Sequence, residues 1–155
     1  MPTTEQKASN DETRKHIARV AALINVFVKE LLRQAEIHDA SKLESPEMEV
    51  MAEFYQKLYD SEFQGEEYEA NRAAMAKALE HHYAVNGHHP EHYKNGIEDM
   101  NLVMLIVMFS DWKASSERQN GGNIRLSIAR AAERFGISPQ LERIFENTIS
   151  LLETT

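Results

Sequence analysis

Helical spacing of apolar residues is the feature that most constrains the fold of this chain. Between residues 17 and 35, apolar side chains recur at steps of three and four residues with no Gly or Pro, which predicts one amphipathic helix of about six turns. The same spacing, bounded by cap residues and glycines, predicts further helices over residues 46–58, 66–83, 97–111, 124–135 and 139–152. No stretch alternates apolar and polar residues as a half-buried strand does. The sequence therefore predicts an all-α fold, a single-domain bundle of about six helices.

The length and charge of the chain limit the classes to which it can belong. Its 155 residues are enough for one domain, and we expect a flexible polar tail over residues 1–12 and a single helical metal-binding domain over residues 13–155. The longest apolar stretch, residues 102–109, falls far short of the ~20 residues of a membrane-spanning helix. A net charge of −8 argues against general binding to duplex nucleic acid, although a local basic pocket for one small anion is compatible with it. We therefore expect a soluble cytoplasmic protein.

Histidine is concentrated in one short segment. Five of the seven histidines lie within residues 81–92, and a second cluster, His-Asp-Ala-Ser-Lys, occupies residues 38–42. Because cysteine is absent, imidazole and carboxylate at this density indicate a hard or borderline metal held by N and O donors. His38 and Asp39 follow the first helix, where the backbone leaves helical geometry and lets neighbouring side chains face one cation. Asp111, a lone acid closing the most apolar helix, needs a cation or a hydrogen-bond donor if it is buried.

Each of these features also has a purely structural explanation. Asp111 would lie in water at a helix end or pair with Arg or Lys from the last two helices, and Asp39 would cap the following turn. The histidine-rich segment would be a solvated polar hairpin. Taken together, the three features favour a metal site over the separate explanations.

Residues 38–42 resemble the His-Asp-x-x-Lys motif of HD-domain metal-dependent phosphohydrolases. The resemblance implies an all-helical fold in which a His, a His-Asp pair and a distant Asp bind one or two divalent metals, and Asp111 matches the distant Asp. Residues 81–87 resemble the paired histidines and Gly-containing loop of the subgroup that hydrolyses cyclic dinucleotides. A more specific resemblance, over residues 36–118, is to a small uncharacterised helical family of phage and bacterial genomes, and this resemblance implies no particular activity. Its motifs are His38-Asp39-x-Ser41-Lys42, Asn86-x-His88-His89-Pro90-Glu91-His92 and Asp111-Trp112.

The HD-domain pattern also requires a first histidine on an earlier helix, and His16 is the only upstream candidate. If the first helix is unbroken, His16 lies about 33 Å from His38 at ~1.5 Å rise per residue, too far to share a cation. Three arrangements stay open: the helix breaks near Asn25, a neighbouring chain of a homo-oligomer supplies His16, or a hairpin histidine takes the position. We favour the third, in which one or two divalent ions (Mn, Fe, Co, Ni, Zn or Mg) are held by His38, Asp39, His82, His88, His89 and Asp111.

The resemblance and the ligand chemistry together predict a divalent-metal-dependent phosphohydrolase acting on a nucleotide or a similar small phosphoester. Asp39 and Lys42 would be catalytic, and Lys42, Glu47 and Trp112 would contact the substrate. Structural alternatives are a surface ion pair for Lys42, a helix-dipole interaction for Glu47 and core packing for Trp112. Two other functions stay open, a di-iron oxygenase of HD type and a catalytically silent, metal-stabilised helical binding module. The protein would act in a bacterium, or in the host cell if a phage encodes it.

Overall fold

The computed structural model describes residues 1–61, 65–118 and 121–153, and these residues form helices and connecting loops without a strand. The predicted all-α class is therefore confirmed. Contacts along the chain divide it into two compact units, residues 1–36 and residues 37–155. No helix in the described part of the chain has both the length and the apolar character needed to cross a membrane.

The first unit is formed by α1 (Thr4–Ile37), a single unbroken helix. A reciprocal cap sets its start: Thr3 Oγ1 accepts a hydrogen bond from Gln6 N at 3.2 Å, and Gln6 Oε1 accepts one from Thr3 N at 2.8 Å. The helix continues through Asn25, so the alternative of a break there is wrong. Although α1 begins at Thr4, the mobility expected of residues 1–12 stays a prediction.

The second unit contains the remaining helices of the described chain. The α-helices are α2 (Glu47–Asp60), α3 (Glu66–Ala74), α4 (Ala76–Val85), α5 (Leu102–Arg118), α6 (Ile124–Phe135) and α7 (Pro139–Leu152). Three short 3-10 helices connect them, η1 (Ala40–Leu43), η2 (Pro90–His92) and η3 (Gly96–Asp99). The described residues thus form seven α-helices where about six were predicted.

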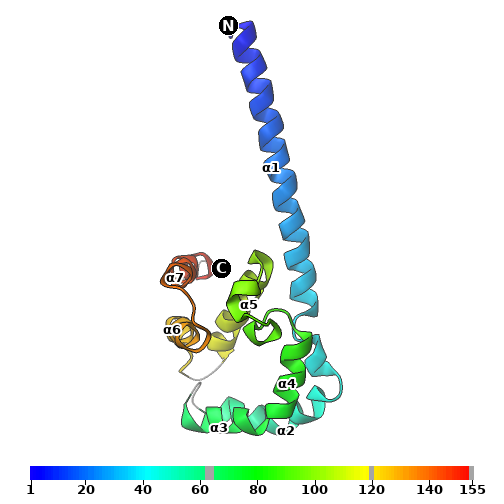
Figure 1. Ribbon diagram of the computed structural model, residues 1–155, viewed down its shortest axis with the longest axis vertical. Helices are drawn as coiled ribbons and strands as arrows, with labels where there is room; N and C mark the ends of the chain where they lie inside the picture. The colour runs from blue at the N-terminus through cyan, green and yellow to red at the C-terminus, as the bar shows by residue number, and fades with distance from the viewer. Residues whose placement is uncertain (62–64, 119–120, 154–155) are drawn as a thin grey trace. The chain divides into compact units, whose positions relative to one another are not determined.

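The additional helix arises at Met75, which interrupts the predicted helix over residues 66–83. Met75 adopts φ −87° and ψ 9°, and its N–H donates to the carbonyl of Arg72, three residues back, at 3.2 Å. Such a bond belongs to a 3-10 turn, which commonly ends an α-helix. The Met75 side chain is buried, and α3 and α4 run in different directions on either side of it (Figure 1).

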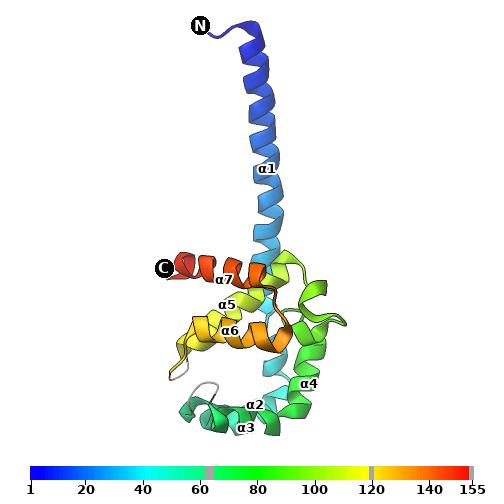
Figure 2. The same ribbon diagram turned by 60° about the vertical axis from the view of Figure 1, so that its left-hand side comes forward.

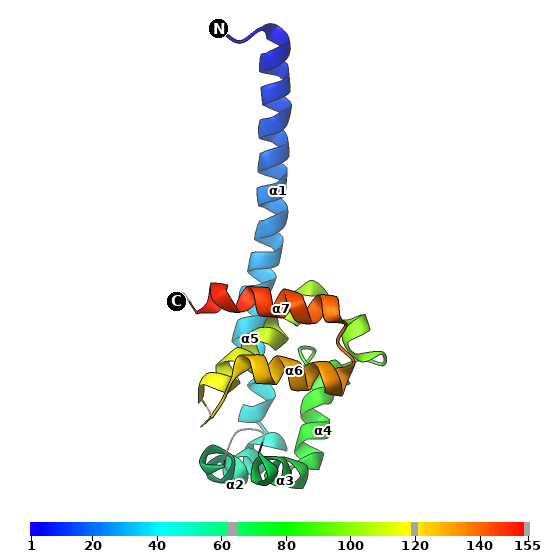
Figure 3. The same cartoon turned by 90° about the vertical axis from the view of Figure 1, so that its left-hand side faces the viewer.

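The apolar core of the second unit lies where α5, α6 and α7 pack together, and Figure 2 shows α5 beside α6. α6 and α7 also run side by side (Figure 3). The largest fully buried apolar side chains of this core are Met108, Ile128 and Ile149. The local sequence sets the limits of both helices: Asn123 Oδ1 caps α6, and Ser138 Oγ caps α7. The predicted ranges of these two helices are confirmed.

The other helices of the unit surround a more polar region. α2 and α3 lie side by side, and α4 packs against α2 (Figure 1). The prediction that Asp111 closes its helix is wrong, because α5 continues to Arg118. Beyond Asp111 the segment contains good helix formers, and Lys113 and Glu117 pair across one turn, so the helix extends past its apolar part.

Candidate metal centre and its cavity

One aspartate and three histidines of the second unit form a compact donor group. A donor atom of each of Asp39, His82, His88 and His89 lies within 4.8 Å of the others. Nε2 of His82 is 3.1 Å from Oδ1 of Asp39 and 2.9 Å from Nε2 of His89. Nε2 of His88 is 3.4 Å from the same oxygen of Asp39. We call these four residues the donor group.

The backbone turn before η1 places Asp39 in the donor group. Asp39 adopts φ 60° and ψ 4°, a left-handed conformation that Asp tolerates better than most residues. Its carbonyl accepts from Lys42 N at 2.9 Å, and its Oδ2 accepts from Lys42 Nζ at 2.5 Å. The Lys42 ammonium therefore binds one carboxylate oxygen, while Oδ1 faces the histidines.

The histidines come from α4 and from the loop that follows it. His82 lies in the last turn of α4, whereas His88 and His89 lie between α4 and η2. The hydroxyl of Tyr93 holds this loop by donating to the carbonyl of Gly87 at 2.8 Å. A Cβ on Gly87 would lie 3.2 Å from that hydroxyl, so the glycine allows this close contact. Tyr93 thereby fixes the loop that carries His88 and His89.

A buried carboxylate sets the orientation of His82. Nδ1 of His82 lies 2.8 Å from Oε2 of Glu47. A carboxylate oxygen can only accept, so Nδ1 carries a proton and donates it to Glu47. Nε2 of His82 is then the nitrogen that presents a lone pair to the donor group. A carboxylate behind a ligating imidazole is the usual arrangement in metal sites, where it fixes the ring and raises its basicity.

Glu47 is itself held by a network of polar groups. It is 0% exposed, its Oε1 lies 2.7 Å from Nδ1 of His81, and Ser41 Oγ donates to its Oε2 at 3.0 Å. Asn86 Nδ2 in turn donates to Ser41 Oγ at 2.8 Å. Burial raises the pKa of Glu47, but the hydrogen bonds from His81, Ser41 and His82 outweigh it, and the pKa is lowered overall. The network therefore keeps an ionised carboxylate behind the donor group.

The donor group has the properties that a divalent cation requires. Among the residues that the structure describes, Oδ1 of Asp39 and Nε2 of His88 are buried without a hydrogen-bond partner. Burial raises the pKa of Asp39, but the imidazoles of His82 and His88 and the Lys42 ammonium lower it well below its ordinary range. Burial, followed by the neighbouring imidazoles, lowers the pKa of His89 to about 2. One ionised carboxylate and three clustered imidazoles fit a borderline divalent metal.

Two of the six predicted ligands lie outside the donor group. The ring of His38 is centred 6.0 Å from that of His88, in an edge-to-face arrangement. Asp111, on α5, accepts a long hydrogen bond from Ser115 Oγ at 3.5 Å. Both His38 and Asp111 nevertheless line the same cavity as Asp39.

This cavity has a volume of about 540 Å³ and is bounded by η1 and by α2 to α6. Lys42 and Trp112, both predicted to contact a substrate, line it, as do Asp39, His82 and His89 of the donor group. Trp112 also packs edge-to-face on Phe145, with ring centroids 5.8 Å apart. It therefore contributes both to the apolar core and to the cavity wall. Glu47 is placed differently from the prediction, because it lies behind His82 and outside the cavity lining.

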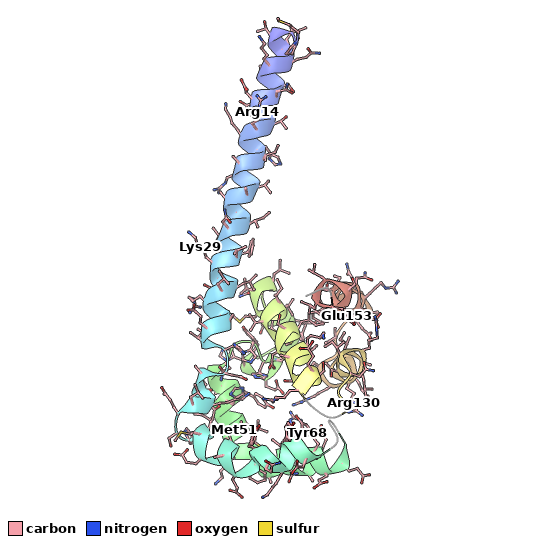
Figure 4. All side chains as sticks on the ribbon, turned by 180° about the vertical axis from the view of Figure 1, so that it is seen from behind. Arg14, Lys29, Met51, Tyr68, Arg130 and Glu153 are labelled. Atoms are coloured by element: carbon pink, nitrogen blue, oxygen red, sulfur yellow. The ribbon has the colours of Figure 1, made fainter. Side chains whose placement is uncertain are left out.

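Four arginines also line the cavity, Arg72 on α3, Arg118 on α5, and Arg130 and Arg134 on α6. No local pattern in the sequence indicates Arg72 or Arg134, because the cavity assembles them from helices distant in the chain. The roles of Ser41 and Asn86 were also missed, although both belong to the motifs that surround the predicted ligands. Figure 4 shows Tyr68 and Arg130, which line the cavity from α3 and α6.

Comparison with known proteins adds a family without an assigned activity. The model of a family of unknown function (DUF5662) matches residues 5–151 of the chain. No curated protein and no solved structure matches it.

Proposed function

The chain belongs to the DUF5662 family of unknown function, and from the geometry of its site we propose that it is a divalent-metal-dependent phosphohydrolase. Its substrate would be a nucleotide or a similar small phosphoester. The observation that carries the proposal is the donor group itself, with two orphaned buried donor atoms, at the wall of a cavity that arginines also line. Such a cavity offers a cation site and anion-binding groups to the same ligand.

Different residues would hold the cation, orient its ligands and bind the phosphoryl group. Asp39, His82, His88 and His89 would hold the cation, with Glu47 orienting His82. A divalent cation held there would polarise a phosphoryl oxygen and lower the pKa of a bound water. Lys42, whose ammonium already contacts Asp39, would neutralise negative charge on the phosphoryl group, since it also faces the cavity.

An HD-like arrangement is part of this proposal, in a modified form. His38 and Asp111, the positions that the resemblance gives to ligands, line the cavity beside the donor group and would serve a second ion or its water. The hairpin histidines would replace the upstream histidine, which is supported by their closeness to Asp39. Trp112, on the wall of the same cavity, offers a face on which a nucleotide base would stack.

Elemental analysis of protein purified without a His-tag tests the metal site. We expect near-stoichiometric divalent metal in the wild type and its loss in Asp39→Asn and His88→Gln. His92→Gln is the matched control, because His92 is exposed and the hydrogen bond described for its side chain goes to the Tyr83 carbonyl, away from the donor group. His16→Gln should also keep the metal. Loss of metal in His16→Gln would instead mean that a neighbouring chain completes the site.

Turnover separates the phosphohydrolase from the other functions. With the metal restored, we expect phosphate release from a panel of nucleotides, and a decrease of about 100-fold in kcat for Lys42→Met if the ammonium stabilises the transition state. Asp39→Asn should abolish turnover together with metal binding. Oxygen consumption by an iron-loaded protein would overturn the proposal in favour of the oxygenase. Metal-dependent folding without turnover of any nucleotide would overturn it in favour of a binding module.

A further inference from the structure

The arginines of the cavity belong to a different part of its wall from the donor group. Arg72, Arg118 and Arg130 come from α3, α5 and α6, whereas the donor group comes from η1, α4 and the loop after α4. The chain as a whole is acidic, with a net charge of −8. Lys42 and four arginines line the cavity together with four carboxylates, so its wall carries a small excess of positive charge in an otherwise acidic protein, which favours an anionic ligand.

Two of these arginines act electrostatically on the same tyrosine. Burial raises the pKa of Tyr68, the charges of Arg72 and Arg118 lower it, and the charges of Glu69 and Asp111 raise it. Arg72 is paired with Glu69 at 3.2 Å and donates through its other terminal nitrogen to the Tyr83 hydroxyl at 2.9 Å. Its guanidinium is therefore held in place before a ligand arrives, which lowers the entropic cost of binding an anion.

Arg72 is also connected to the donor group, through one aromatic side chain. The ring of Tyr83, which carries the hydroxyl bound by Arg72, is centred 4.9 Å from the ring of His89. Arg72 thus lies one aromatic side chain away from the donor group, on the same cavity. A ligand would need a second anionic group, apart from the one at the metal, to reach the guanidinium groups.

We propose that Arg72, Arg118 and Arg130 form a second anion subsite, and that the substrate is a phosphoester carrying a second phosphate group. This inference rests on the proposed function, in which the first phosphoryl group reacts at the donor group. Guanidinium groups bind phosphate through paired N–H donors and keep their charge at any physiological pH. A cavity of about 540 Å³ has the size of sites that take small-molecule ligands.

Isothermal titration calorimetry with inorganic pyrophosphate tests the subsite in the full chain after metal is removed by chelation. We expect the wild type to bind, and the double variant Arg118→Gln with Arg130→Gln to weaken binding by at least about tenfold, because charge-assisted hydrogen bonds are lost. Arg125→Gln is the matched control, since Arg125 is an exposed arginine of α6 outside the cavity lining, and it should change the affinity less than about twofold. Asp39→Asn should bind pyrophosphate at least as tightly as the wild type does, because it removes a negative charge from the same cavity.

Equal affinity in the double variant and in Arg125→Gln would overturn the subsite, and so would loss of binding in Asp39→Asn. Circular dichroism checks that each variant keeps its helices. If chelation unfolds the wild type, the same pair of arginine variants is compared in metal-loaded protein, with the same tenfold criterion. Metal content and turnover report separately on the proposed function. A protein that binds metal and hydrolyses a monoester, but shows no arginine-dependent pyrophosphate binding, would overturn the subsite alone.

Discussion

The second unit contains two buried centres that differ in what stabilises them. Between α5, α6 and α7, Ile128 and Ile149 are 0% exposed among other apolar side chains. At the donor group, His82 and the Glu47 behind it are 1% and 0% exposed, yet both are polar. Apolar burial is favourable by itself and does not depend on direction, whereas a buried polar group is costly unless each of its atoms finds a partner. The polar centre therefore depends on a specific set of contacts, and the apolar core does not.

That dependence is what makes the polar centre a candidate site. The buried carboxylate of Glu47 accepts hydrogen bonds from Ser41, His81 and one nitrogen of His82, and Asn86 donates to Ser41. The network ends at Oδ1 of Asp39 and Nε2 of His88, which lack a hydrogen-bond partner among the described residues. A cation shared by these atoms would complete the network. Without metal, the two unpartnered atoms lower the stability of the fold, and metal binding would restore it.

Truncation of the apolar core should have the largest effect on stability and none on the site. Ile149→Ala removes a fully buried side chain of α7, so we expect the free energy of unfolding to fall by about 2–5 kcal/mol. Urea denaturation measures this loss, and Ile149→Val, which leaves most of the side chain, should cost only about 1 kcal/mol. Metal content per folded chain should stay unchanged in both variants. A loss of metal in Ile149→Val would show that the two centres are not independent.

Removing the buried carboxylate should have a smaller effect on stability and a large one on metal binding. Glu47→Ala leaves imidazole donors without their acceptor, and we expect a loss of about 2 kcal/mol in the free energy of unfolding. Metal affinity should fall roughly 10–100-fold, because His82 loses the group that orients it. Chelator competition measures the affinity.

Glu49→Ala is the matched control for Glu47→Ala. Glu49 lies in the same first turn of α2 but is exposed, so its removal should cost less than about 0.5 kcal/mol and leave the metal affinity unchanged. If the two variants behave alike, the carboxylate of Glu47 acts only on the helix dipole, as the alternative interpretation of the sequence held.

The two centres also differ in how far sequence predicts them. The ranges of α6 and α7 follow from neighbouring residues, because Asn123, Ser138 and Gly136 act within one turn of the helix ends. Local density of histidine likewise indicates the members of the donor group. The interruption at Met75 coincides with the burial of its side chain, and the local spacing, which predicts one helix over residues 66–83, does not indicate it.

Long-range contacts explain what sequence reasoning missed in the site. Glu47 lies 35 residues before His82, and nothing near Glu47 in the chain indicates that it would face an imidazole. Its acidic character in a first turn suggested the helix dipole or a substrate contact instead. Arg72 and Arg130 meet on one cavity only after α3 and α6 are placed on its wall. Local patterns thus select residue types, whereas the fold decides which of them meet.

The smallest predicted effect concerns pH and arises only in the polar centre. The pKa of His89 is lowered from its ordinary value of 6.5 to about 2, mainly by burial. In the unfolded chain His89 gains a proton near pH 6.5, whereas the folded protein keeps it neutral down to about pH 2. Its contribution to stability is therefore fully present above pH 6.5 and is lost as the pH falls toward 2. Lowering the pH from 6.5 to 5.5 should cost about 1 kcal/mol in chelated protein.

Urea denaturation of chelated protein at pH 7.5, 6.5 and 5.5 measures this dependence, and His89→Gln should reduce its slope. The groups that act on His89 are His88, His82, Asp39 and Lys42, and the carboxyl of Asp39, whose pKa is also lowered, adds a loss only below its ordinary value of 3.8. The effect of His89 is therefore separated from that of Asp39 in this pH range. The Ile149→Val variant should keep the full slope, because the apolar core contains no group that titrates. An unchanged slope in His89→Gln would mean that another histidine of the polar centre gains the proton on unfolding.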